Sequence, residues 1–243
     1  MNKKEIHELL LTNSDQIFDL LRDKNISNRL LILEVLTQIA ETRPHLVGKI
    51  TYDLSEVLRL ELLPVFAEGQ TAEDRAAFKV ATNLVSKLAL TLENPIPLRG
   101  LINYFGTQII DRNEAVKIPS IEAFGDLLRV MPQYFDTDLL KFVMKLSNDE
   151  DSKVQAALMS AMEKIARANS EIPLKIFGIA TELLNSKSEN VRFNTASFIR
   201  TLSERAPDEC KTVLPILREL KKKDPCSKVR DMVTAAIQVI SLS

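Results

Sequence analysis

A valine followed by a basic or polar residue opens one predicted helix after another, and this repeat constrains the fold more than any other feature. Val116-Lys117, Val154-Gln155, Val191-Arg192 and Val229-Arg230 recur at an interval of about 38 residues. Upstream, Phe78-Lys79 lies one such interval before the first of them, and Asn28-Arg29 lies one longer interval before that. Such a period predicts a unit stacked on copies of itself, because one unit cannot bury its apolar face alone.

The repeating unit is predicted to be a pair of helices. Apolar residues recur at helical spacing almost throughout; Val191, Phe198 and Leu202, for example, share one helix face. Prolines mostly stand where helices begin or end, and Thr71 with Asp74 resembles a capping box. The predicted helices cover residues 3–11, 14–23, 27–42, 45–63, 71–92, 96–110, 113–130, 133–147, 151–168, 172–185, 188–205, 208–222 and 226–242.

An acidic residue stands six positions before the base of several of these pairs. An acid in this turn can accept hydrogen bonds from free N–H groups at the start of the second helix and suits its positive dipole. The base can reach the acid of its own turn or of the adjacent turn. The pairs are Asp23/Arg29, Glu73/Lys79, Asp111/Lys117 and Asp224/Arg230, and the pattern decays to Asp149/Gln155 and Ser186/Arg192.

A two-helix unit of this length, with an acid in the turn and Val-Arg opening the second helix, resembles a HEAT repeat. Pro215 inside a first helix is a further mark of that family, as Pro64 would be. Periodicity alone would fit armadillo-like repeats equally well. The resemblance implies an all-α, right-handed α-α superhelix of about six helix pairs. It also implies a single repeat domain over 1–243, with an extra helix in 1–13, divergent repeats in 14–92 and regular repeats in 93–243.

Composition excludes several classes of protein. The net charge is −1, and bases are not clustered as a nucleic-acid footprint would need. The two cysteines form no metal-binding spacing and are expected to be reduced thiols. No stretch reaches the roughly 20 apolar residues that a membrane helix needs, and the first residues are too interrupted by charge for a signal peptide. We therefore expect a soluble, cytoplasmic protein.

No arrangement of residues indicates catalysis, a metal site or a cofactor. The two histidines, His7 and His45, lie on different predicted helices with no third ligand. A HEAT-like family of iron-dependent hydroxylases uses several His-Glu pairs, and only His7-Glu8 occurs here. There is no glycine-rich phosphate loop and no Ser/His/Asp or Cys/His order. We expect no enzymatic activity.

The side of the second helices opposite to the core is the predicted binding surface, because the HEAT resemblance implies that second helices line a concave face. Counted from the valine of each pair, buried positions fall at 0, 4, 7, 8 and 11, and the opposite side falls at 2, 5, 6, 9 and 13. This side mixes apolar residues with charges of both signs, which suits a protein or peptide partner. The predicted contact residues are Ile118, Glu122, Arg129, Met159, Glu163, Arg167, Phe193, Arg200 and Glu204. Any of the apolar ones could instead pack on a neighbouring helix.

The predicted function is that of a scaffold or adaptor that holds a protein or peptide partner. Two alternatives remain open from family likeness. HEAT-like DNA glycosylases have a similar length, although they would be expected to show a basic face with aromatic residues and a catalytic Asp. HEAT-like bilin lyases are an enzymatic alternative, without a recognisable pigment site in this sequence.

The last helix, predicted at 226–242, is apolar around most of its circumference. A terminal repeat is expected to present a polar outer face. Met232 and Val239 are therefore predicted to form an end-docking face for a second copy of the chain or another protein. The alternative is that each is simply tolerated at the surface.

Overall fold

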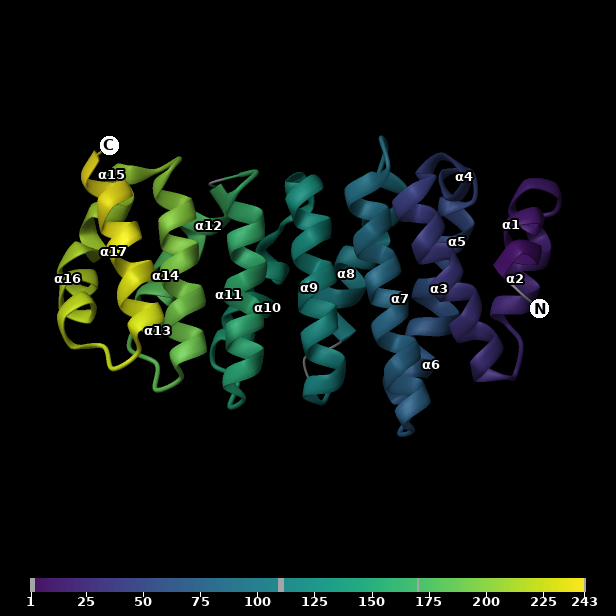
Figure 1. Ribbon diagram of the computed structural model, residues 1–243, viewed down its shortest axis with the longest axis horizontal. Coiled ribbons are helices and arrows are strands. Elements are labelled where there is room, and N and C mark those ends of the chain that lie inside the picture. Colours follow the sequence, from purple (N-terminus) through teal and green to yellow (C-terminus); the bar gives the residue numbers. More distant parts are fainter. Residues whose placement is uncertain (1–2, 109–111, 170, 243) are drawn as a thin grey trace. The chain divides into compact units, whose positions relative to one another are not determined.

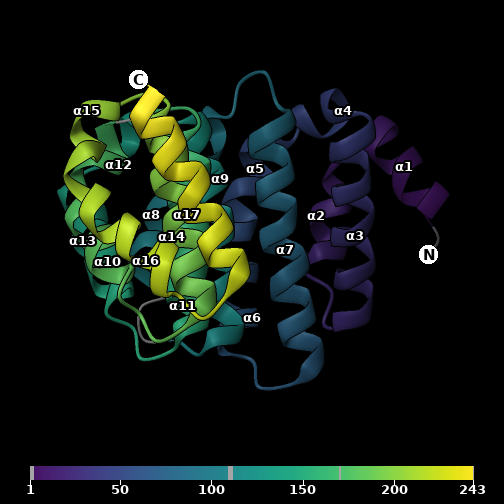
Figure 2. The same ribbon diagram turned by 60° about the vertical axis from the view of Figure 1, so that its left-hand side comes forward.

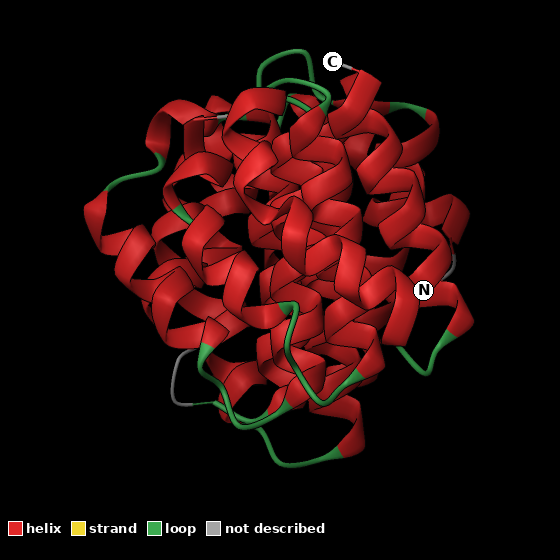
Figure 3. Cartoon of the chain, turned by 90° about the vertical axis from the view of Figure 1, so that its left-hand side faces the viewer, coloured by secondary structure: helices red, strands yellow, loops and turns green. Residues whose placement is uncertain are grey.

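A computed structural model of the chain describes residues 3–108, 112–169 and 171–242, and all regular structure in these residues is helical (Figure 3). The all-α prediction is therefore confirmed. Contacts divide the chain into two compact units, Met1–Met131 and Pro132–Ser243, which we call unit 1 and unit 2. The prediction of one domain over 1–243 stays a prediction.

Unit 1 contains three long second helices, α3, α7 and α9. They lie side by side in Figure 1, with α7 packed between the other two. The elements are α1 (Lys3–Thr12), α2 (Asp15–Leu21), α3 (Ile26–Thr42), α4 (Pro44–Gly48), α5 (Thr51–Val57), a π-helix (Leu58–Leu62), α6 (Leu63–Glu68), α7 (Ala72–Thr91), a 3₁₀-helix (Ile96–Leu98), α8 (Arg99–Gln108) and α9 (Glu114–Val130).

Unit 2 repeats the arrangement with α11, α14 and α17 as second helices. The central helix α14 packs against both α11 and α17 (Figure 1). The elements are a 3₁₀-helix (Pro132–Tyr134), α10 (Thr137–Ser147), α11 (Ser152–Ala166), α12 (Glu171–Lys175), α13 (Phe177–Leu183), α14 (Glu189–Ser203), α15 (Pro207–Cys210), a 3₁₀-helix (Lys211–Val213), α16 (Leu214–Lys223) and α17 (Ser227–Leu242).

The second helices are continuous as predicted, whereas several first helices are broken. The predicted helix 45–63 is four elements, 172–185 is two and 208–222 is three. Proline explains two of the breaks, because it lacks the N–H that would bond the carbonyl four residues earlier. A π-helix widens the turn just before Pro64, and a 3₁₀ turn precedes Pro215, which then lies in the first turn of α16.

The core of each unit lies between its first and second helices. The apolar positions predicted from helical spacing, such as Val191, Phe198 and Leu202 of α14, are fully buried. Phenylalanines fill much of this space, with Phe78, Phe105 and Phe124 buried in unit 1 and Phe142 and Phe198 buried in unit 2. Exposed second-helix residues on the opposite side are therefore held on a packed support.

The predicted capping box at the start of α7 is confirmed. Thr71 Oγ1 accepts from the Asp74 N–H at 3.0 Å, and Asp74 Oδ2 accepts from the Thr71 N–H at 3.1 Å. We expect Thr71→Ala to lower the free energy of unfolding by about 1 kcal/mol, because two backbone donors lose part of their capping. Thr91→Ala at the other end of α7 is the matched control, since its hydroxyl only bonds the Lys87 carbonyl. Urea unfolding measures both, and an equal loss would contradict the role of the cap.

Candidate binding surface

In the turns between paired helices, one side chain forms hydrogen bonds with the turn. It belongs to a basic or amide residue four positions after the N-cap of the second helix. Its side chain donates to backbone carbonyls of its own turn rather than to an acidic side chain of that turn. Arg192 NH1 donates to the Ser186 and Lys187 carbonyls at 2.8 and 3.0 Å. The remaining examples are Arg29 to Lys24 O, Arg75 to Gln70 O, Gln155 to Ser147 O and Asp149 O, and Arg230 to Asp224 O and Pro225 O.

Two predicted acid–base pairs are corrected by this geometry. In α7 the residue in the turn-closing position is Arg75, so the pairing of Glu73 with Lys79 is wrong; Lys79 is exposed, one helical turn further on. Arg230 reaches the carbonyl of Asp224 at 2.7 Å and not its carboxylate. Asp111 lies outside the described residues.

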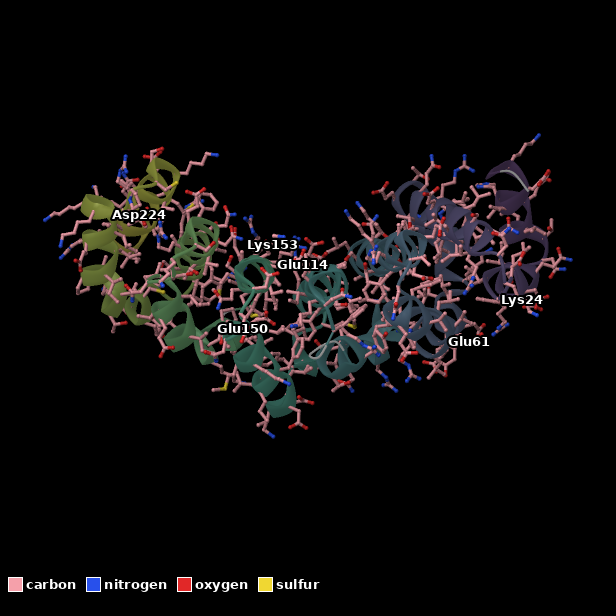
Figure 4. All side chains as sticks on the ribbon, turned by 90° about the horizontal axis from the view of Figure 1, so that it is seen from below. Lys24, Glu61, Glu114, Glu150, Lys153 and Asp224 are labelled. Carbon is pink, nitrogen blue, oxygen red and sulfur yellow. The ribbon has the colours of Figure 1, made fainter. Side chains whose placement is uncertain are left out.

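The carboxylate of Asp224 instead pairs with the base of the preceding turn. Arg192 Nε donates to Asp224 Oδ2 at 2.6 Å and Arg192 NH2 donates to Oδ1 at 3.0 Å, in a bidentate pair. Both side chains are buried, with 10% and 1% exposed (Asp224 is labelled in Figure 4). The hydrogen bonds from Arg192 hold the pKa of Asp224 below its ordinary value, and they raise the pKa of Arg192. The pair fixes the α13–α14 turn to the α16–α17 turn.

Second helices of unit 2 are joined sideways by contacts that each span 38 residues of sequence. Asn194 Nδ2 donates to the Ala156 carbonyl at 2.9 Å, and Thr201 Oγ1 donates to Glu163 at 3.4 Å. Arg205 NH2 donates to the Arg167 carbonyl at 2.5 Å. Equivalent residues of these two repeats are 37 positions apart, as Val154 and Val191 are. In each contact, a residue of the α11 repeat therefore meets the residue that follows its equivalent in the α14 repeat.

The exposed side of α11 and α14 carries most of the contact residues predicted for unit 2. We call it the second-helix face of unit 2. Lys153, on the same side of α11, is labelled in Figure 4. Phe193 is half-buried, and the side chains of Arg167, Arg200 and Glu204 are 59%, 42% and 53% exposed. The face comprises Lys153, Ser160 and Glu163 of α11 with its C-cap Arg167, and Asn190, Phe193 and Arg200 of α14 with its C-cap Glu204.

Charged residues of this face are held in place by neighbours on the same helix. Arg167 NH2 lies 2.6 Å from Glu163 Oε1, and Arg200 NH2 lies 3.8 Å from Glu204 Oε1. Both are i, i+4 pairs, which add little stability at an exposed site. They do limit the directions in which the guanidinium groups point.

The prediction that Met159 contacts a partner is wrong, because its side chain is fully buried. Its equivalents Ile121 and Ala196 are also fully buried. This position lies on the flank of its helix, between the core side and the outward side, and is closed to solvent. Glu163 is only partly accessible, because Arg167 and Thr201 both bond it.

The three contact residues predicted before α11 belong to unit 1. Glu122 and Arg129 are exposed on α9, and Ile118 is half-buried. They share the outward side of α9, as helical spacing predicts. The contact residues of α11 and α14 belong to unit 2, so the prediction that all of them form one surface stays a prediction.

The predicted end-docking residues do not occupy the open end of unit 2. Met232 and Val239 stand where Asn194 and Thr201 stand in α14, the positions that face the preceding helix. Both are half-buried. The flank of α17 that faces away from α14 carries the equivalents of four buried α14 residues, Arg192, Ala196, Ile199 and Ser203. These are Arg230, Thr234, Ile237 and Ser241, of which only Ile237 is apolar.

Neither a candidate metal cluster nor a membrane-spanning helix occurs in the described part of the chain. Within 3–108, 112–169 and 171–242, no three His, Cys, Asp or Glu side chains lie close enough together to hold a metal ion. No helix in the same ranges has the length and apolar character needed to cross a membrane.

Comparisons with known structures identify the fold. A mutant of Kap121p matches all of this chain over 26% of its own length, with a TM-score of 0.68 and 15% identity. A designed armadillo repeat protein in complex with the peptide (KR)4 has a TM-score of 0.67 and 18% identity, over 93% of this chain and 98% of that one. The fold is that of armadillo and HEAT repeat solenoids. An engineered protein with a TM-score of 0.68 and 18% identity covers 96% of this chain and 100% of its own. No family model or curated protein sequence matches.

Proposed function

We propose that this chain is a non-enzymatic scaffold or adaptor that binds a protein or peptide partner on the outward faces of its second helices. The second-helix face of unit 2 carries the proposal, because it combines the half-buried Phe193 with the exposed Arg167 and Arg200. Aromatic residues and arginine are the side chains that most often dominate protein interfaces. The designed armadillo repeat protein with a bound peptide supports the same use of the fold.

Carboxylates on this face favour a protein partner over a nucleic acid. Glu163 and Glu204 lie 2.6 and 3.8 Å from the two arginines that would otherwise contact phosphates. A phosphate-binding groove is expected to be uniformly basic. The partner would therefore present both an apolar anchor and charges of both signs.

Reversing three charges tests the proposal. We expect Arg129→Glu, Arg167→Glu and Arg200→Glu together to weaken binding of a captured and purified partner by about tenfold or more, because an arginine anchor becomes a repulsive charge. Isothermal titration calorimetry measures the affinity. The matched control is Arg218→Glu, Lys221→Glu and Lys222→Glu, which makes the same charge change on exposed residues of the first helix α16. Equal affinity of both folded variants would contradict the proposal.

A further inference from the structure

An open cavity of about 470 Å³ lies between α1 and α3 in unit 1. It exists because the ten-residue α1 covers only part of the seventeen-residue α3. Figure 2 shows α1 beside the end of α3 that leads into α4. Ile6 and Leu10 of α1 are buried in this contact, and Val35 and Ile39 of α3 form the apolar floor beside them. On the corresponding flank of α14 lies the fifteen-residue α11.

Three basic side chains line this cavity, and no acidic residue does. Lys4 and His7 come from α1, one helical turn apart, and Arg43 comes from the junction of α3 and α4. The backbone of Arg43 is fixed, because its N–H donates to the Ile39 carbonyl at 2.7 Å and its carbonyl accepts from the Leu46 N–H at 3.0 Å. Arg43 therefore presents its guanidinium to the cavity from a junction whose backbone is fixed.

The partner of the Arg43 guanidinium is unusual for unit 1. Arg43 NH1 lies 3.1 Å from His7 Nε2, so an imidazole nitrogen is its acceptor. Several other cations of the unit face carboxylates, as in Arg22–Glu61, Arg59–Glu56 and Lys87–Glu41, and Arg29 and Arg75 donate to backbone carbonyls. Within the described part of the chain Arg43 makes no ion pair. Residues 1–131 hold 18 Asp and Glu against 15 Lys and Arg, so this cavity is a basic site in an acidic unit.

We propose that this cavity binds a phosphate monoester between Arg43 and His7. A guanidinium presents paired N–H donors that match phosphate oxygens, and the imidazole of His7 can donate an N–H to a further oxygen. Lys4 adds a positive charge on the same side. Several cationic groups attract a doubly charged phosphate more strongly than they attract a single carboxylate. The apolar floor would contact the carbon chain that carries the phosphate.

The histidine content of the chain makes a direct test possible. His7 and His45 are the only histidines, and His45 on α4 lies outside the cavity. We expect inorganic phosphate, added to the full chain at constant pH and ionic strength, to shift the imidazole ¹H–¹³C signals of His7 along a saturating curve. The signals of His45 are expected to stay in place. No shift at His7, or parallel shifts of both histidines, would overturn the proposal.

Variants separate the site from general charge effects. Arg43→Gln is expected to weaken phosphate binding by about tenfold, since a charge-assisted hydrogen bond is lost. Arg99→Gln removes one exposed arginine elsewhere in unit 1 and is expected to leave binding unchanged. Circular dichroism checks that both variants are folded, and Arg43→Lys, which keeps the charge, is expected to retain part of the affinity. Equal binding by Arg43→Gln and Arg99→Gln would overturn the assignment.

A second titration identifies the source of the phosphate. A phosphoserine peptide and its unphosphorylated form are compared with inorganic phosphate by the same His7 signals. Tighter binding of the phosphopeptide than of inorganic phosphate assigns the site to a phosphorylated residue. Equal binding assigns it to the free ion. Binding of the unphosphorylated peptide as tightly as the phosphopeptide would overturn the proposal.

Discussion

Replacing Asp224 with alanine is expected to lower the free energy of unfolding of unit 2 by about 3 to 5 kcal/mol. The substitution leaves the Arg192 guanidinium, with 10% of its side chain exposed, without its bidentate partner. It also removes the acceptor of the Cys226 N–H in the α16–α17 turn. Hydrogen exchange in α14 and α17 of the full chain measures the loss, because it reports on unit 2 separately from unit 1.

Two further variants test the cause of that loss. Asp231→Ala removes an exposed aspartate from α17 and is expected to change stability by less than about 0.5 kcal/mol. The double variant Arg192→Leu and Asp224→Ala is expected to be less destabilised than the sum of its single variants, because no buried charge is left unpaired. An additive double variant would show that the two side chains do not stabilise each other.

Acid is expected to weaken the same pair. Because the pKa of Asp224 is lowered in the folded chain, its carboxylate stabilises unit 2 fully at neutral pH. That stabilisation is lost as the pH falls below about 3.9, the ordinary aspartate value, toward the lower pKa of folded Asp224. Asp224→Ala should therefore reduce the acid dependence of unit 2 exchange over that range. An unchanged acid dependence would contradict the link.

The second large effect is expected from Phe198 in the centre of α14. Phe198 is fully buried, and Phe198→Ala is expected to lower the free energy of unfolding by about 3 to 5 kcal/mol, because it leaves a cavity in a packed core. Faster hydrogen exchange throughout α11, α14 and α17 would report the loss. A loss below about 1 kcal/mol would mean that the core collapses around the missing ring.

Phe193, five residues earlier on the same helix, is the matched control. It is half-buried on the second-helix face of unit 2, so Phe193→Ala is expected to cost less stability than Phe198→Ala. Its effect is expected on the affinity for a protein partner instead. If Phe193→Ala destabilised unit 2 as much as Phe198→Ala and left the affinity unchanged, Phe193 would be a core residue.

Local patterns in the sequence were sufficient for the parts of the fold that depend on near neighbours. Helical spacing of apolar residues predicts the continuous second helices and their buried side, because residues three and four apart share a helix face. Thr71 and Asp74 predict the capping box of α7 for the same reason. The same spacing does not predict the breaks inside the first helices. A proline shows where a backbone hydrogen bond is lost, but not whether the preceding turn becomes a π-helix or a 3₁₀-helix.

The candidate surface could be predicted only in part. A helical wheel separates the core side of a second helix from its outer side, and the side chains of Arg167, Arg200 and Glu204 are 59%, 42% and 53% exposed. It cannot tell solvent from a neighbouring helix, so Met159 was placed on the surface although it is fully buried. The same limit applies to Met232 and Val239, which face the preceding helix by equivalence with Asn194 and Thr201.

The helical repeat, its nearly constant period and the outward side of each second helix can be predicted without a structure, because they follow from local geometry and spacing. Which acid meets which base depends instead on how the helix pairs stack. Arg192 and Asp224 are 32 residues apart, and only the stacking of one helix pair on the next brings them together. The stacking also decides which outer positions remain accessible, because lateral contacts across a repeat depend on the offset between neighbouring helices.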